Sequence, residues 1–201
     1  MVNFPIGLVG TEPDADWYDR DNRKNVGKFE DSWKHESLIN ATIGVSVLEV
    51  GCNEGKLLRR LQQYGYDCYG TDISPFVIDL AKEKSTGINY KVSDANKIPW
   101  ENKFHTIIAS DLIEHLDNPV KALKVWKNHI HPLGRIVIFT PNAFAQSKLV
   151  KASNGEDIIE PRAHINMMSV WSLAKHVEDA GLTVKHMSTP IEEFIICIAG
   201  I

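Results

Sequence analysis

One stretch of ten residues constrains the fold of this chain more than any other: Ser46–Gly55, with the sequence SVLEVGCNEG. A short apolar run carries an acid, Glu49, near its end, and a turn with Gly51 and Gly55 follows before a helical pattern begins. Glycines between a buried strand and a helix let a ligand approach the backbone. The stretch therefore predicts a strand, a turn and a helix with a ligand site at the turn, although a purely structural turn would show the same pattern.

The chain after this turn alternates between strand and helix patterns. Strands are expected at 45–50, 67–71, 88–92, 104–110, 134–140, 182–187 and 193–199, and helices at 29–42, 56–64, 75–84, 119–130 and 169–180. Such alternation predicts an α/β fold, a doubly wound sheet of seven mostly parallel strands with helices on both faces. The last two strands are expected to pair as an antiparallel hairpin at the edge of the sheet.

Length and composition bound the class of protein. We expect residues 1–201 to form a single domain, with 1–28 as an N-terminal arm and 141–168 as a long loop. The net charge of −4 does not favour a nucleic-acid partner, although a local basic patch stays open. The chain has three widely spaced cysteines, no signal-peptide pattern and no membrane span, which together indicate a cytoplasmic protein.

Further acids follow the second and third expected strands. Asp72 ends the second strand about twenty residues after Glu49, the distance at which an acid reaches ribose hydroxyls in doubly wound folds. Ile73 beside it could cover an adenine face. Asp94 follows the third strand and, with the backbone N–H of Ala95, could bind the adenine amino group. Each acid alone could be a helix cap, but acids at three consecutive strand ends favour a nucleotide-like ligand.

Five segments, taken together and in this order, resemble the successive motifs of class I S-adenosylmethionine (SAM)-dependent methyltransferases: LEVGCNEGKLL, YGTDIS, SDANKIPW, FHTIIASDLIEHLDNP and PLGRIVIFTPN. The resemblance covers about residues 29–200. It implies a Rossmann-like methyltransferase fold with an antiparallel last strand, and an enzyme that transfers the SAM methyl group. A dehydrogenase is the competing interpretation of a glycine turn with a ribose acid, but it gives the ASDLIEHL and TPN segments no role.

The resemblance also implies a set of SAM contacts. Glu49 and Gly51 would hold the methionine part, while backbone groups of Ser110 and Leu112 would close the pocket. Asn53 stands where a third glycine is common, and asparagine tolerates positive φ better than other non-glycine residues. The expected cofactor-binding residues are Glu49, Gly51, Cys52, Asn53, Gly55, Asp72, Ile73, Asp94, Ala95, Ser110 and Leu112.

Another group of polar residues follows the fourth strand. Asp111, Glu114 and His115 would share one face if the stretch turned helically, and such a set can hold Mg²⁺ or Mn²⁺. His164 could complete the metal site, and His115 and His164 are the candidate catalytic residues. The segment resembles that of ubiquinone-biosynthesis O-methyltransferases and, with His164, that of small-RNA 3′-terminal 2′-O-methyltransferases. Local packing by Glu114 and His115, or a metal-free general base at His115, are the alternatives.

The function expected from these patterns is transfer of the SAM methyl group to an unidentified acceptor, most simply an oxygen of a small molecule. That acceptor would enter over Asp111–His115, beneath the 141–168 segment and the N-terminal arm. Metal-assisted 2′-O-methylation of an RNA terminus and a non-catalytic SAM-fold binding protein are the alternatives.

Overall fold

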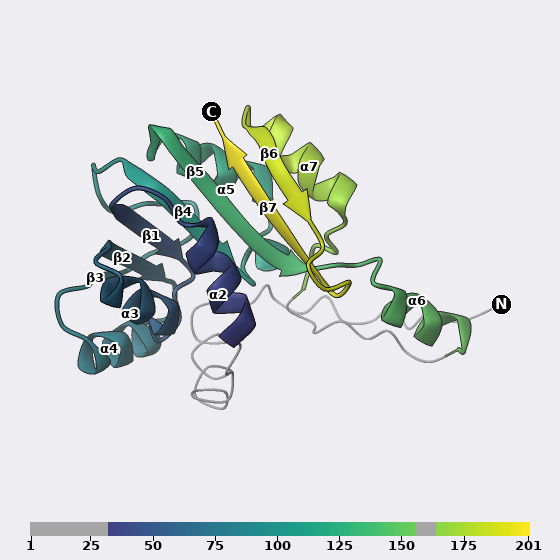
Figure 1. The fold of residues 1–201 in the computed structure, drawn as a ribbon, viewed down its shortest axis with the longest axis horizontal. Helices are drawn as coiled ribbons and strands as arrows, with labels where there is room; N and C mark the ends of the chain where they lie inside the picture. The colour runs from purple at the N-terminus through teal and green to yellow at the C-terminus, as the bar shows by residue number, and fades with distance from the viewer. Residues whose placement is uncertain (1–31, 156–163) are drawn as a thin grey trace.

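The structure, a computed structural model, describes residues 32–155 and 164–201. The predicted N-terminal arm lies outside these residues, as do the first residues of the helix expected at 29–42. Figure 1 shows a twisted sheet with helices on both faces. Its seven strands follow the order β3-β2-β1-β4-β5-β7-β6. The predicted doubly wound α/β fold is therefore confirmed.

The strands are close to the predicted ones. They are β1 (Ser46–Val50), β2 (Asp67–Asp72), β3 (Asn89–Val92), β4 (Phe104–Ser110), β5 (Ile130–Pro141), β6 (Thr183–Ser188) and β7 (Phe194–Gly200). Strands β1 to β5 are parallel, whereas β7 is antiparallel to both β5 and β6. The last hairpin forms with its second strand inside the sheet. This follows from composition, because β7 (FIICIAG) is apolar throughout and β6 (TVKHMS) is polar enough for an edge.

The helices cover the two faces of the sheet. They are α2 (Ser32–Ala41), α3 (Lys56–Gln63), α4 (Pro75–Lys84), the short 3₁₀ helix η1 (Ile113–His115), α5 (Pro119–Lys127), α6 (Gln146–Ser153) and α7 (Val170–Asp179). Helices α5 and α7 bury Trp126 and Leu173 in the core of one face. Helices α2, α3 and α4 bury Leu38, Leu58 and Ile78 in the core of the other. None of the described helices is long and apolar enough to cross a membrane.

Two segments differ from the sequence-based expectation. Strand β5 begins at Ile130 rather than at 134, because an irregularity in its pairing with β4 accommodates the Pro132–Gly134 stretch. The 141–168 segment was expected to have no regular structure, yet it contains α6. No described residue of α6 is buried, so this helix leaves no apolar periodicity in the sequence. Figure 1 shows α6 extending away from the sheet.

The packing beneath the glycine turn gives a stability prediction. A Cβ atom added to Gly70 on β2 would lie 2.6 Å from Leu58 Cδ1 and 2.8 Å from Cys52 Sγ. Gly70→Ala should therefore lower the free energy of unfolding by about 1–3 kcal/mol, measured by urea denaturation.

Gly200→Ala on β7 is the matched control for this substitution. It also changes a strand glycine without positive φ, but the added Cβ would lie 3.1 Å from the flexible side chain of Lys185 and at an ordinary contact distance of 3.6 Å from the Gly134 carbonyl oxygen. Equal urea midpoints for the two variants would contradict the assignment of a tight contact at Gly70.

Candidate functional site

The glycine turn is fixed to the neighbouring strand by backbone hydrogen bonds. The N–H groups of Gly51 and Cys52 both donate to the carbonyl oxygen of Thr71, at 2.7 and 2.9 Å. Gly51, Asn53 and Gly55 all have positive φ, at 75°, 47° and 74°. Asparagine thus adopts the conformation expected where a third glycine is common. The turn opens at the carboxyl end of β1, where a ligand can reach its backbone.

The two glycines of the turn have different roles. A Cβ at Gly51 would lie 3.1 Å from the Leu112 side chain, so this side chain packs over one side of the turn. A Cβ at Gly55 would lie 2.2 Å from the hydroxyl of Tyr90. Gly55 is therefore needed for packing and for the left-handed start of α3, and the approach of a ligand falls to Gly51.

Asp72 bonds to the glycine turn from the end of β2. Its Oδ2 accepts a hydrogen bond from the backbone N–H of Asn53 at 2.9 Å, and its Oδ1 accepts one from Ser74 N–H at 3.0 Å. These contacts fix both the turn and the carboxylate. Half-buried Ile73 follows directly, so the predicted ribose and adenine residues stand beside the turn.

Glu49 is a buried acid that faces the covering helices α2 and α3. Its side chain lies on the same face of the sheet as Val47, and the residue is only 5% exposed. Burial raises the pKa of Glu49 to about 8, while the charge of Lys34 acts to lower it. Among the described residues, its Oε2 atom has no hydrogen-bond partner. A buried carboxylate oxygen in this state fits the ammonium group of a SAM methionine end.

Hydrogen bonds also fix the turn after β3, at Asp94 and at Ala95. Asp94 is exposed, and its Oδ1 accepts hydrogen bonds from the backbone and side-chain nitrogens of Asn96 at 2.6 and 3.0 Å. The carbonyl oxygen of Ala95 accepts one from the indole N–H of buried Trp126 at 2.9 Å. The predicted adenine contacts thus belong to a turn that is fixed by hydrogen bonds within the protein.

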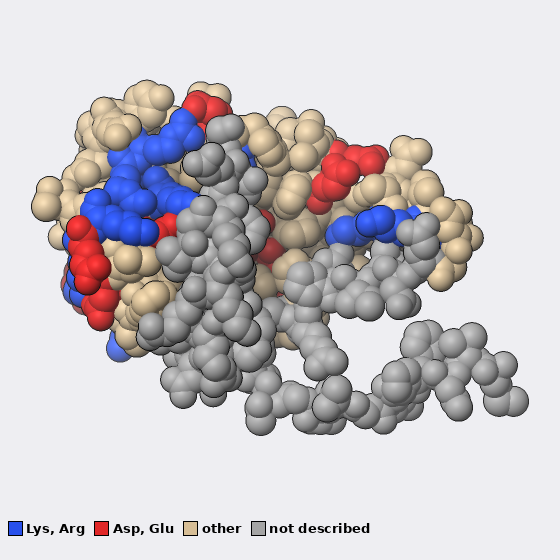
Figure 2. Space-filling view, turned by 90° about the horizontal axis from the view of Figure 1, so that it is seen from below, with Lys and Arg blue, Asp and Glu red and all other residues tan. Residues whose placement is uncertain are grey.

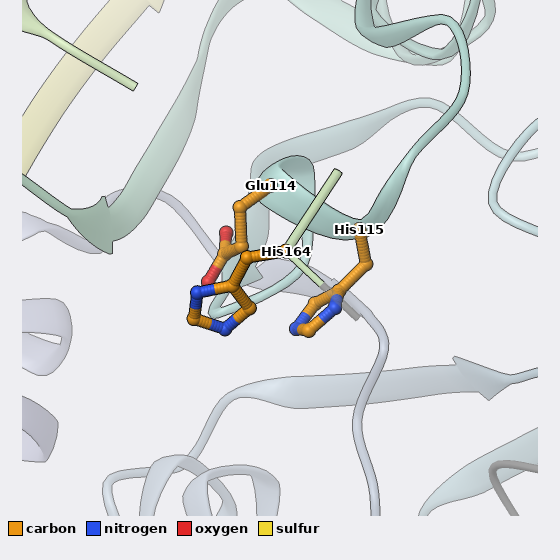
Figure 3. Close-up of side chains that lie close together, drawn as sticks. All are labelled: Glu114, His115 and His164. Atoms are coloured by element: carbon orange, nitrogen blue, oxygen red, sulfur yellow. The ribbon is translucent and has the colours of Figure 1, made fainter. Parts of the chain in front are cut away.

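Glu114, His115 and His164 lie close together after β4, where the acceptor is expected to enter. We call this the acceptor side. Figure 3 shows Glu114 and His115 coming from η1 and His164 from the segment that faces it. One possible ligand atom from each lies within 4.8 Å of the others, and the two imidazole rings have centroids 4.8 Å apart. Asn166 joins the segments by donating its backbone N–H to the carbonyl oxygen of Glu114 at 2.9 Å. The sequence-based expectation that His164 lies beside this group agrees with the geometry.

Glu114 is the buried member of this group. It is 2% exposed, and its Oε2 accepts a hydrogen bond from the Thr140 hydroxyl at 2.8 Å. Its Oε1 has no hydrogen-bond partner among the described residues. Burial first, and the charge of Asp111 second, raise the pKa of Glu114 to about 8. The Oε1 atom is therefore available to a proton, a cation or an acceptor hydroxyl.

Asp111 is placed differently from its expected partners. It precedes η1 and has a φ of 49°, which is not a helical value. Asp111 therefore does not share a helix face with Glu114 and His115, although the sequence spacing had suggested that it would. Its Oδ2 lies 2.7 Å from Lys34 Nζ and accepts a hydrogen bond from the Ser110 hydroxyl at 3.3 Å. The converging group does not include Asp111. A short 3₁₀ turn in place of an α-helix is the reason.

Lys34 is the site residue that sequence reasoning missed. It lies on α2 and pairs with Asp111, and its charge also acts on Glu49 and Glu114. The sequence contains no motif around Lys34, because only the packing of α2 on the sheet brings it to the site. A lysine one position after Trp33, on the helix before the first strand, was the only signal.

The two buried acids give a pH prediction for the ligand-free protein. Burial raises the pKa of Glu49 and of Glu114 to about 8 in the folded state, whereas an exposed Glu has an ordinary pKa of 4.5. Between these pH values the unfolded state holds fewer protons, so stability should fall as the pH rises. A Glu49→Gln/Glu114→Gln double variant should show a flatter decline in melting temperature between about pH 6 and about pH 8.5.

Glu178→Gln is the control for this experiment, because Glu178 is exposed on α7. This variant should keep the wild-type slope of melting temperature against pH. If the double variant shared that slope too, the two buried acids would not be the source of the pH dependence.

Comparisons with known proteins agree with this geometry. A family model described as a methyltransferase domain matches residues 15–187. A ubiquinone biosynthesis O-methyltransferase of Coxiella burnetii is 32% identical over 104 residues, which are 49% of this chain and 44% of that relative. The match thus spans less than half of the relative's length. The Pseudomonas paraeruginosa protein of the same name is 23% identical over 189 residues, 84% of this chain and 78% of that relative.

A solved structure shows the same fold. Magnesium protoporphyrin IX methyltransferase from Synechocystis was solved with bound S-adenosylhomocysteine (SAH). It has a TM-score of 0.70 at 17% identity. The alignment covers 92% of this chain and 96% of that one. The match to the family model spans most of the chain, and the sheet order and glycine turn agree with it. The chain therefore belongs to the methyltransferase-domain family of class I SAM-dependent methyltransferases.

Proposed function

We propose that this protein binds SAM at the carboxyl ends of β1, β2 and β3 and transfers its methyl group to an acceptor oxygen. The observation that carries the proposal is the buried Glu49 carboxyl, whose Oε2 has no hydrogen-bond partner among the described residues. It stands beside a left-handed glycine turn, where the ammonium group of the methionine end would supply the missing partner. Membership in the family supports the same cofactor.

Each part of SAM has residues that fit it. Glu49 would bind the ammonium group and the backbone at Gly51 would lie along the methionine chain. Asp72 would bind the ribose, and the Asp94–Ala95 turn would bind the adenine. When bound, SAM supplies a methyl group on a sulfonium, which an acceptor attacks in line. The protein aligns the acceptor with that methyl group and excludes water.

The acceptor side must remove a proton from an oxygen nucleophile. Glu114 has one oxygen held by Thr140, and a carboxylate oxygen of Glu114 lies within 4.8 Å of ligand atoms of His115 and His164. An imidazole of this group would accept the acceptor proton. The same three residues also fit a divalent cation, Mg²⁺ or Mn²⁺, which when bound would lower the pKa of an acceptor hydroxyl. We therefore assign proton removal to Glu114, His115 and His164 as a unit.

A small molecule is the acceptor class that we favour. The curated relatives are ubiquinone biosynthesis O-methyltransferases. Figure 2 shows the described Lys and Arg side chains on this face in separate groups with acids beside them. On α3, Lys56 pairs with Glu54 and Arg60 pairs with Glu36. Acids thus neutralise part of the positive charge on α3, which weakens its attraction for RNA phosphates.

An RNA terminus is the second candidate acceptor. It is favoured by one observation, the position of His164 next to Glu114 and His115. The salt dependence of methyl transfer, measured in a screen with labelled SAM, distinguishes the two acceptor classes. Transfer to RNA should fall steeply as salt rises because phosphate contacts release counterions, whereas transfer to a small neutral acceptor should change little.

Proton release tests the assignment of Glu49. Binding of an ammonium group favours the ionised carboxylate, so SAH should release about one proton near pH 7 as it binds. Calorimetry in buffers of different ionisation enthalpy measures this number. Glu49→Gln should bind SAH more weakly and release no proton.

Asp72→Ala should also lose SAH affinity in the same calorimetric titrations. Wild-type protein that binds no SAH would refute the proposed function. Binding of SAH without transfer to any acceptor in cell extract would identify a non-catalytic SAM-binding protein.

A cation at the acceptor side is tested by titration with Mn²⁺ followed by electron paramagnetic resonance. Wild-type protein should bind Mn²⁺, and His164→Ala should weaken binding about tenfold or more, since one of three ligands is lost. His186→Ala on the exposed strand β6 should bind like the wild type. Activity that is indifferent to EDTA, together with no Mn²⁺ binding, would leave an imidazole base as the mechanism.

A further inference from the structure

The donor and acceptor sides of the site are connected through one cation. Lys34 Nζ lies 2.7 Å from Asp111 Oδ2, and the Lys34 side chain is only 15% exposed. Its ammonium group also lies 5.7 Å from the centroid of the Phe139 ring, so its hydrocarbon stem runs along the end of β5. The neighbouring Trp33 packs against Phe139 and Phe194, with centroids 5.6 and 5.9 Å away. Lys34 is thus held in place by the packing of α2.

The acids around Lys34 come from both sides of the site. Glu49 belongs to the donor side, and Asp111 and Glu114 belong to the acceptor side. The charge of Lys34 acts on both buried acids, Glu49 and Glu114, while it pairs directly with Asp111. Arg59 acts on Glu49 as well, but Lys34 reaches both sides. A new anion near Glu49 would therefore interact with a cation that already pairs with Asp111.

The methionine end of SAM brings such an anion. Its ammonium and carboxylate groups are attached to the same carbon, so a carboxylate must lie near Glu49 when the ammonium group does. A carboxylate beside buried Glu49 and Asp72 would be repelled unless a cation compensates it. The sheet register places Glu49 opposite Ile108 on β4, three residues before Asp111, so the Lys34–Asp111 pair lies at the same end of the sheet as Glu49.

We propose that Lys34 is shared between Asp111 and the methionine carboxylate of the cofactor, so that cofactor binding weakens the Lys34–Asp111 ion pair and releases Asp111 toward the acceptor side. This inference rests on the proposed function and adds a binding residue and a coupling to it. Asp111 is suited to such a role because it holds a left-handed φ of 49°, which is unusual for a non-glycine residue and typical of functional sites. Cofactor binding thereby changes the electrostatic environment of Asp111, which lies three residues before Glu114.

Two ligands separate this role from a structural one. SAH carries the amino-acid end, whereas 5′-methylthioadenosine keeps the adenosine and sulfur and lacks that end. Lys34→Met keeps the apolar stem over Phe139 and removes the charge, so it should weaken SAH about tenfold and leave methylthioadenosine unchanged, as measured by calorimetry. Lys34→Arg should retain most of the SAH affinity. Lys124→Met, on the exposed face of α5, is the matched control and should change neither ligand.

A double-mutant cycle tests the sharing. Asp111→Asn removes the competing charge, and asparagine tolerates positive φ, so the backbone is kept. This variant should tighten SAH several-fold in the wild-type background and have no effect in the Lys34→Met background. If Asp111→Asn weakens SAH instead, Asp111 positions Lys34 and does not compete for it, and the sharing is refuted.

The outcomes also distinguish this inference from the proposed function. Wild-type protein that binds neither SAH nor methylthioadenosine would refute SAM binding itself. Wild-type protein that binds both, with Lys34→Met weakening the two equally, would leave SAM binding intact and overturn the role of Lys34.

Discussion

The site depends on the hydrogen bonds that attach the glycine turn to β2. Two consecutive N–H groups, of Gly51 and Cys52, donate to one carbonyl oxygen of Thr71, and the Asp72 carboxylate accepts a third bond from Asn53. Because these bonds fix the turn at the carboxyl end of β1, the Glu49 side chain is held under α2 and away from water. The burial of the Glu49 side chain, and with it the raised pKa of this acid, follows from that placement.

The structure places two buried acids at one end of the sheet, and the charge of Lys34 acts on both. Glu49 and Glu114 each keep one oxygen without a protein partner among the described residues, and burial raises the pKa of both. Unsatisfied buried carboxyls destabilise a fold, so they persist where a ligand completes them. In the proposed function one faces the donor and the other faces the acceptor, and Lys34 is the residue that we propose to couple them.

The sequence was sufficient for the parts of this fold that have a local signal. The strand, turn and helix at Ser46–Gly55 were predictable because glycine positions and apolar runs report backbone geometry directly. The position of His164 beside Glu114 and His115 was expected from the chemistry of a metal site and from a family resemblance, not from sequence spacing. Helix α6 and the role of Lys34 were not predictable, since the first buries no side chain in the described structure and the second arises from the packing of α2. The left-handed conformation of Asp111 also has no sequence signal.

Helix α6 buries none of its residues, and this has a consequence for how such an enzyme can change. Mutations there remove no core contact, so they are nearly neutral for folding, while the segment continues into the one that carries His164. Sequence drift can therefore accumulate in this helix without eroding the core that holds the glycine turn. A protein built this way can diverge toward new acceptors while its donor chemistry stays the same.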